Sequence, residues 1–117
     1  MINEVAENRE IAQQYKELLR ISYQRLTSSD KKLIRLAFDI AVDAHKNQRR
    51  KSGEPYVLHP ISVAKIVAGE IGLDSTSIAS ALLHDVIEDS NYTIEDIKKT
   101  FGNTISKIVY GLTKISN

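Results

Sequence analysis

The sequence predicts an all-α fold, a helical bundle of about six helices. Apolar residues recur at helical three- and four-residue spacing through most of the 117 residues. Capping residues, glycines and prolines divide this pattern into segments of helical length. No stretch alternates apolar and polar residues for long enough to predict a strand. A chain of this length forms one domain at most and can bury roughly two-thirds of its unfolded surface.

The first predicted helix covers residues 4–26, and it ends near Thr27. Its apolar stripe consists of Ile11, Tyr15, Leu18, Leu19 and Leu26. Ser28 or Ser29 can cap a second helix, because a serine oxygen accepts a hydrogen bond from the first turn. This second helix is expected to continue to about Lys46. Its buried face is predicted to contain Leu33, Ile34, Ala37, Phe38, Ala41 and Ala44.

A polar loop is expected between Asn47 and Tyr56, because the apolar period stops there and turn residues gather at positions 52–55. Pro60 suits the first position of a third helix, where its missing N–H would have had no partner. The core face of this helix is predicted to contain Ile61, Ala64, Val67, Ala68 and Ile71. Gly72 is expected to end it.

The last predicted helices follow clear boundary signals. Asp74 can cap a fourth helix that runs to about Asp89. Positions 93 and 96 hold Thr and Asp, a variant of the capping box, and precede a fifth helix that stops at Gly102. A sixth helix is expected to begin around Thr104 and to keep its apolar period to Ile115.

Composition excludes several classes of protein. Lys and Arg (16) nearly balance Asp and Glu (15), so no overall field favours nucleic acid or an anionic membrane as partner. The chain has no cysteine, which excludes a disulfide framework and a thiolate zinc site and fits a reducing compartment. No apolar run approaches the roughly 20 residues of a membrane span, and residues 1–7 do not resemble a signal peptide. We therefore expect a cytoplasmic protein.

The most informative segment is residues 83–89, Leu-His-Asp-Val-Ile-Glu-Asp. On one continuous helix, His84, Glu88, Asp85 and Asp89 would fall at about 0°, 40°, 100° and 140°, all within one broad sector. An imidazole beside a carboxylate suits a borderline or hard divalent ion, and further carboxylates can orient water or move protons. The plainer alternative is a solvated acidic helix end beside a half-buried histidine.

A second histidine and a basic loop add to this pattern. His59 precedes a helix-starting proline, where a histidine on its own is more often a polar boundary residue than a metal ligand. Arg49, Arg50 and Lys51 form a run that could simply be solvated. Because Arg forks onto phosphate and Lys makes point contacts, we predict phosphate binding by Arg50 and Lys51 and leave Arg49 in solvent. His45 is expected to be structural, supporting the metal site from the second helix.

These residues resemble a known family. Residues 50–56 (Arg-Lys-Ser-Gly-Glu-Pro-Tyr), His59-Pro60, residues 84–89 and residues 111–115 (Gly-Leu-Thr-Lys-Ile) resemble the N-terminal hydrolase domain of RelA/SpoT proteins. The resemblance covers roughly residues 31–117. It implies an HD-domain helical bundle of the HD superfamily of metal-dependent phosphohydrolases. It also implies removal of the 3′-pyrophosphate from the stringent-response alarmones ppGpp and pppGpp, with manganese as the metal.

The resemblance implies roles for the residues that match its motifs. His59, His84 and Asp85 match three metal ligands of the family. Glu88 and Asp89 match the acidic pair next to the attacking water, and we favour Glu88 as the primary group and Asp89 as its helper. An intact acidic pair is typical of the hydrolase-competent members of the family, as opposed to those that retain only alarmone synthesis.

Arg50 and Lys51 match the loop that contacts the nucleotide. The resemblance divides the chain into an N-terminal helix, residues 1–27, and the N-terminal part of an HD-type hydrolase domain, residues 28–117. It also places a further Asp ligand and nucleotide-binding residues beyond the equivalent of Asn117. The expectation is therefore an incomplete bundle with weak or absent activity, which self-associates through its exposed helical surface.

Three functions remain open from the sequence. The first is alarmone hydrolysis, as part of a bifunctional protein that also makes the alarmone from GTP and ATP in a following domain. The second is an HD phosphohydrolase that acts on another nucleotide or phosphate ester. The third is a non-catalytic helical module that binds a nucleotide or a protein partner. The metal motif by itself does not choose among them.

Overall fold

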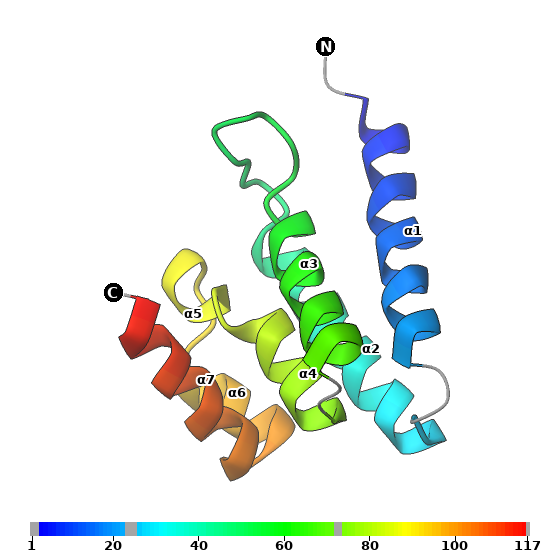
Figure 1. Cartoon of the computed structure of the whole chain (residues 1–117). Helices are drawn as coiled ribbons and strands as arrows, with labels where there is room; N and C mark the ends of the chain where they lie inside the picture. The colour runs from blue at the N-terminus through cyan, green and yellow to red at the C-terminus, as the bar shows by residue number, and fades with distance from the viewer. Residues whose placement is uncertain (1–2, 23–25, 72–73, 117) are drawn as a thin grey trace.

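A computed structural model describes residues 3–22, 26–71 and 74–116. Within these ranges the chain forms helices and no strand, apart from one isolated bridge between Arg49 and Pro55. The elements are α1 (Glu4–Ser22), α2 (Ser28–Ala44), α3 (Leu58–Ile66), the π-helical turn η2 (Val67–Ile71), α4 (Ser75–Leu83), α5 (Val86–Asp89), α6 (Ile94–Phe101) and α7 (Asn103–Ser116). The predicted all-α fold is confirmed, with the fourth predicted helix divided into α4 and α5 (Figure 1).

The helix α4 lies at the centre of the bundle. It packs against α2, α3 and α7, while α1 packs against α3 and η2. Figure 1 shows α1 and α7 on opposite sides of the molecule, with α3 and α4 between them. Almost every residue of α4 is buried, because neighbouring helices cover it on several sides. Its largest fully buried side chains are Ile78, Leu82 and Leu83.

The end of α1 and the start of α2 both differ from the prediction. α1 ends at Ser22, short of the predicted residue 26, and residues 23–25 lie outside the described ranges. Thr27, not Ser28 or Ser29, caps α2, because its extended backbone (φ −80°, ψ 173°) lets its side chain accept from Asp30 N–H. The Asp30 carboxylate in turn accepts from Thr27 N–H at 2.9 Å. This reciprocal pair satisfies two amides that no helical carbonyl could reach.

The third helix begins two residues before Pro60, at Leu58. Proline is tolerated at this third position because first-turn amides have no partner within the helix. The helix then widens into η2, and the predicted stop at Gly72 lies outside the described ranges. Gly69 lets α1 approach η2 closely, because a Cβ atom there would lie 2.7 Å from Ile21 Cγ2.

The fourth predicted helix is interrupted at His84 and Asp85, within the candidate motif of residues 84–89. Asp74 caps it as expected, accepting from Ser77 N–H at 3.1 Å. α4 nevertheless ends at Leu83, and Asp85 adopts φ −95° and ψ −4° before α5 begins at Val86. The angular positions computed for one continuous helix are therefore wrong beyond His84. The sequence cannot show this break, because a histidine and an aspartate are both compatible with a helix interior.

The last two helices begin and end as predicted, within one residue. Thr93 and Asp96 form the reciprocal capping box at the start of α6. Gly102 ends α6 with φ +91°, a conformation that side chains with a Cβ rarely adopt. α7 begins at Asn103, one residue before the predicted start.

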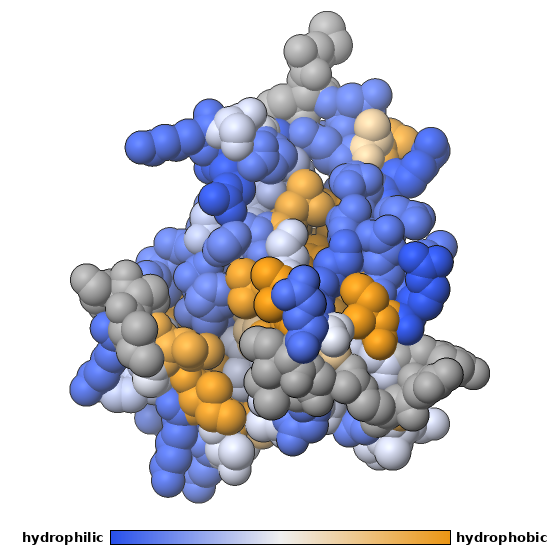
Figure 2. Space-filling view, viewed as in Figure 1, coloured by the Kyte–Doolittle hydropathy of each residue, from blue (hydrophilic) through white to orange (hydrophobic). Residues whose placement is uncertain are grey.

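The surface is mostly hydrophilic. Apolar side chains show through it over α7 and between α1 and α3 (Figure 2). Among the side chains that the structure describes, the large apolar ones that are exposed are Val5, Ile21, Leu36, Ile66 and Tyr110. None of the helices in the described part of the chain is both long enough and apolar enough to cross a membrane.

Candidate metal centre and active site

Three of the predicted metal ligands come together where α3 and α4 meet. His59 is the second residue of α3, His84 follows the last residue of α4, and Asp85 lies in the turn before α5. One possible ligand atom from each lies within 4.8 Å of the others. The two imidazole rings are 6.1 Å apart between centroids, and Asp85 is only 8% exposed. This spacing allows one cation to contact all three side chains.

The hydrogen bonding of His84 prepares it for a metal. Its Nδ1 lies 2.6 Å from the Ala81 carbonyl oxygen, which only accepts, so Nδ1 carries the proton. In the neutral ring Nε2 then carries no proton and offers a lone pair. This nitrogen lies 3.2 Å from Asp85 Oδ2. Two electron-rich atoms facing each other at this distance favour a cation between them. The donor set, two imidazoles and one carboxylate, fits a divalent metal ion.

The surroundings of His59 favour its neutral form. Burial lowers the pKa of His59 below its usual range, and the positive charge of Arg50 lowers it further. The Asp85 carboxylate acts in the opposite direction but is a smaller effect. A neutral imidazole is the form that ligates metal ions, so the electrostatics at His59 agree with the geometry.

Tyr56, for which the sequence predicted no role, contacts the candidate ligand Asp85. Its hydroxyl donates to Asp85 Oδ2 at 2.9 Å. Burial, followed by this hydrogen bond, raises the pKa of Tyr56 to about 12, so the hydroxyl stays a donor at neutral pH. Its ring also contacts the His59 ring, with centroids 5.9 Å apart. The only signal in the sequence was its place at the end of the segment 50–56.

The acidic pair Glu88 and Asp89 lies on the single turn α5 and is exposed. This turn follows directly from the candidate ligand Asp85, whose carbonyl accepts from Asp89 N–H at 3.2 Å. Among the described residues, neither acid belongs to the group of ligand atoms around His84. The charge of Asp89 nevertheless contributes to the raised pKa of Tyr56, behind burial and Asp85. The two acids therefore lie beside the candidate metal ligands but do not belong to the group that could coordinate the ion.

A cavity of about 500 Å³ lies beside the acidic turn. Asp89 lines it, together with Ser90, Tyr92 and the end of α2. The Tyr92 hydroxyl donates to Asp43 Oδ2 at 2.7 Å across this region, which raises the pKa of Tyr92. The segment after α5 is thus tied to the end of α2.

The basic loop places its cations next to the metal ligands. Arg50, Lys51, Ser52, Tyr56 and His59 line a cavity of about 290 Å³. The guanidinium of Arg50 is also close enough to His59 to lower the pKa of that imidazole. Two cations beside a group of metal ligands form a site suited to phosphate groups.

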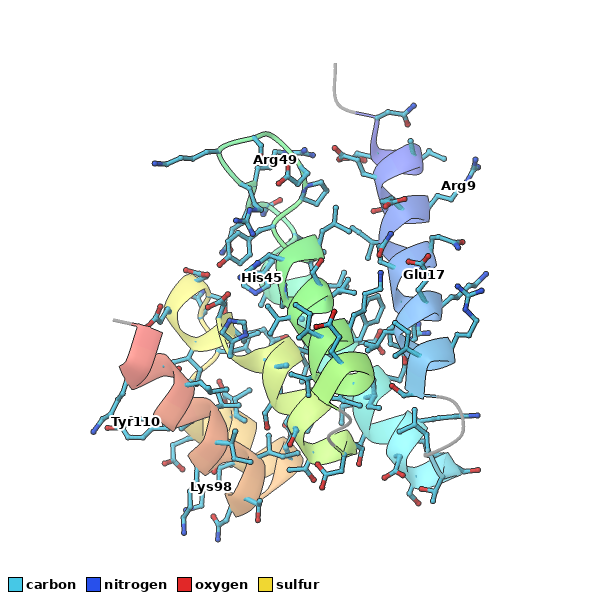
Figure 3. The ribbon with its side chains drawn as sticks, in the orientation of Figure 1. Arg9, Glu17, His45, Arg49, Lys98 and Tyr110 are labelled. Atoms are coloured by element: carbon cyan, nitrogen blue, oxygen red, sulfur yellow. The ribbon has the colours of Figure 1, made fainter. Side chains whose placement is uncertain are left out.

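Arg49 was expected in solvent, and it is exposed, but its guanidinium is paired with other groups of the protein. Its guanidinium forms a two-pronged ion pair with Glu7 of α1, at 2.8 and 2.5 Å, and donates to the Gly53 carbonyl at 2.6 Å. Gly53 itself has φ +101°, which favours glycine at this turn. The loop is therefore fastened to α1 through Arg49 (Figure 3). Glu7 is 42 residues away in sequence, so no local pattern could reveal this pair.

His45 lies at the base of the loop, at the end of α2 (Figure 3). It is 1% exposed, and its ring contacts Tyr56 with centroids 4.8 Å apart. Its Nδ1 lies 2.8 Å from Gln48 Oε1. In the described part of the chain, it does not belong to the group of possible metal ligands.

Comparison with known proteins agrees with this geometry. The family model described as "HD domain" matches residues 37–117, more than half of the chain. The guanosine-3′,5′-bis(diphosphate) 3′-pyrophosphohydrolases of Aquifex aeolicus and Haemophilus influenzae are 48% and 51% identical over 82 and 76 residues, or 70% and 65% of this chain. The bifunctional (p)ppGpp synthase/hydrolase SpoT of Escherichia coli is 46% identical over 84 residues, 72% of this chain.

These alignments cover only 11% to 12% of the relatives' own lengths. The similarity therefore concerns one region of much longer proteins. The candidate metal ligands, the acidic pair and the basic loop all lie within residues 37–117, which match the HD domain. The chain belongs to the HD domain family, as its resemblance to the hydrolase domain of RelA/SpoT proteins predicted.

Proposed function

We propose that this chain carries the site for metal-dependent hydrolysis of the 3′-pyrophosphate of ppGpp and pppGpp. The observation that carries the proposal is the group of His59, His84 and Asp85, whose ligand atoms lie within 4.8 Å beside a cavity lined by two cations. Relatives with 46% to 51% identity are named for this reaction. The metal would be held by these three side chains, and Mn²⁺ is our choice among divalent ions.

Each group has a role that its surroundings favour. A divalent cation at such a site polarises a phosphoryl oxygen and supplies hydroxide at neutral pH. Arg50 and Lys51 bind the phosphates or the base of the nucleotide from the loop. Glu88 orients the attacking water and takes its proton, with Asp89 as its helper. Both carboxylates are exposed, so they can reach a bound substrate without first leaving a buried position.

We also propose the division of the chain into an N-terminal helix, residues 1–27, and an HD-type unit, residues 28–117. The match to the HD domain within residues 37–117 supports this division. The ion pair between Glu7 and Arg49 nevertheless links the first part to the loop of the second. The Escherichia coli relative is named as a bifunctional (p)ppGpp synthase/hydrolase, and we propose the same bifunctional setting for this chain.

The test of the metal centre is calorimetric titration of Mn²⁺ into the metal-free chain and into a His84→Ala variant. We expect binding near one ion per chain in the parent and its loss in the variant, because the substitution removes one of three ligands. Binding of equal strength in both proteins would contradict the proposed ligand set.

The test of the acid is a Glu88→Gln substitution, with Glu95→Gln as the matched control on the exposed face of α6. Release of pyrophosphate from radiolabelled ppGpp should be lost in Glu88→Gln and retained in Glu95→Gln, whereas Mn²⁺ binding should persist in both. Hydrolysis at the parent rate in Glu88→Gln would refute the role of Glu88.

An HD phosphohydrolase with another nucleotide or phosphate ester as substrate is the alternative. A substrate panel separates the two, because only the proposed enzyme should prefer a nucleotide with a 3′-pyrophosphate over the same nucleotide without it. A parent chain that binds metal but prefers a different phosphate ester would establish the alternative.

A further inference from the structure

The single turn α5 is too short to hold itself in place. A helix of one turn has few internal hydrogen bonds, so its position depends on contacts with the rest of the protein. One of these contacts comes from Gln48, which follows α2 and whose Nε2 donates to the carbonyl oxygen of Asp89, the last residue of α5. This hydrogen bond joins residues that are 41 positions apart in the sequence.

The hydrogen bonding of Gln48 determines which way its amide points. The Asp89 carbonyl can only accept, so the amide nitrogen must face α5 and Oε1 must face the other way. Oε1 lies 2.8 Å from His45 Nδ1, which therefore carries a proton and donates. His45 Nε2 is buried without a hydrogen-bond partner among the described residues, which agrees with a proton on Nδ1. The Asp89 carbonyl and the buried imidazole thus hold the Gln48 amide in the same orientation from its two sides.

The backbone of Gln48 belongs to the same arrangement. Its N–H donates to the His45 carbonyl at 3.0 Å, and its carbonyl accepts from Tyr56 N–H at 2.9 Å. Tyr56 in turn donates to the metal ligand Asp85, whose carbonyl accepts from Asp89 N–H. One residue therefore links the end of α2, the end of the basic loop and the acidic turn.

We propose that Gln48, oriented by the buried His45, is a positioning residue that sets the acidic turn α5 against the metal ligands. The inference rests on the proposed function for the role of Glu88 and Asp89. Gln48 touches neither the substrate nor the reacting atoms, and it acts by fixing the carbonyl of Asp89. Glutamine suits this position because it combines a donor for that carbonyl with an acceptor for His45 on one rigid amide. A glutamate lacks the donor, and a methionine lacks both.

The experiment compares the parent chain with Gln48→Glu, Gln48→Met and the control Gln13→Glu, which makes the same charge change at an exposed position of α1. Three quantities are measured: hydrolysis of ppGpp, calorimetric Mn²⁺ affinity, and amide hydrogen exchange of α5. We expect both Gln48 variants to lower kcat about 10- to 100-fold, the usual effect of removing such a supporting hydrogen bond. KM and Mn²⁺ affinity should stay at parent values, while the amide of Asp89 exchanges faster.

The outcomes separate this inference from the proposed function. If the parent neither binds Mn²⁺ nor hydrolyses ppGpp, the proposed function fails. Hydrogen exchange at the Asp89 amide then decides by itself whether Gln48 holds α5. Unchanged exchange in both Gln48 variants overturns the inference, whatever the activity. A loss of Mn²⁺ affinity that parallels the loss of kcat also overturns it, because Gln48 would then act on the metal ligands. An equal loss of kcat in Gln13→Glu would show that the added negative charge alone causes the loss, and this result would overturn the inference as well. If Gln48→Glu fails to fold, Gln48→Met supplies the same comparison without a buried charge.

Discussion

The substitution Tyr56→Phe isolates one hydrogen bond at the proposed metal centre. It removes the hydroxyl that donates to Asp85 Oδ2 at 2.9 Å and keeps the ring that contacts His45 and His59. Asp85 is 8% exposed, so water cannot easily replace the lost donor. The carboxylate would then be free to rotate away from the lone pair of His84 Nε2, which lies 3.2 Å from the same oxygen.

The expected loss follows from the strength of this hydrogen bond. A hydrogen bond to a charged acceptor contributes about 1.5–3 kcal/mol. A factor of ten in affinity corresponds to about 1.4 kcal/mol, so full loss of the orienting effect weakens Mn²⁺ binding roughly 10- to 100-fold. This range agrees with the usual effect of removing the hydrogen-bond partner of a metal ligand. The raised pKa of Tyr56, about 12, keeps the donor protonated throughout the range in which the assay is run.

Calorimetric titration of Mn²⁺ at pH 7 measures this loss directly. The matched control is Tyr110→Phe, because Tyr110 lies on α7, is 49% exposed, and loses the same hydroxyl without touching the site. Circular dichroism establishes that both variants remain folded. Parent-like affinity in Tyr56→Phe would refute the argument that this hydroxyl orients Asp85. An equal loss in Tyr110→Phe would refute it too, because the effect would not be local.

Two further predictions concern the loop and the core. The hydrogen bond from Arg49 holds the pKa of the Glu7 carboxyl below its usual value of 4.5, so the pair is complete at neutral pH and is lost as the pH falls through the lowered pKa. An NMR titration of the Glu7 carboxyl should therefore show a midpoint below 4.5 in the parent and a return toward it in Arg49→Gln; equal midpoints would contradict the pairing. Leu82→Ala should lower the free energy of unfolding in urea by about 2–5 kcal/mol, because Leu82 is 0% exposed at the centre of the bundle. Leu36→Ala, at a side chain 41% exposed, should change it by about 0.5 kcal/mol, and similar losses in the two variants would contradict the assigned core.

The helices were predictable because their signals are local. The capping box of Thr93 and Asp96, the cap at Asp74 and the stop at Gly102 each depend on residues within one turn of the boundary. The buried faces of the helices repeat with the helical period for the same reason. Where two local signals competed, as at Thr27 and the two serines that follow it, the choice depended on a backbone angle that no pattern contains.

The candidate site was predictable only as a set of residues. The spacing of residues 84–89 indicated metal ligands and acids, and the resemblance implied which residues do what. Their arrangement was not predictable, since the break at Asp85 separates α4 from α5. The support from Tyr56, the contact of Gln48 with α5 and the anchoring of Arg49 by Glu7 all join residues that are 29 or more positions apart.

The sequence by itself determined the helical class, most helix boundaries and the candidate residues of the site. These follow from short-range periodicity, capping and the ligand preferences of side chains. The tertiary structure decided how His59 from one helix reaches His84 and Asp85 at the end of another, and what holds each group there. The physical reason is that hydrogen bonds and burial between distant segments depend on how the helices pack, and that packing is a property of the whole chain.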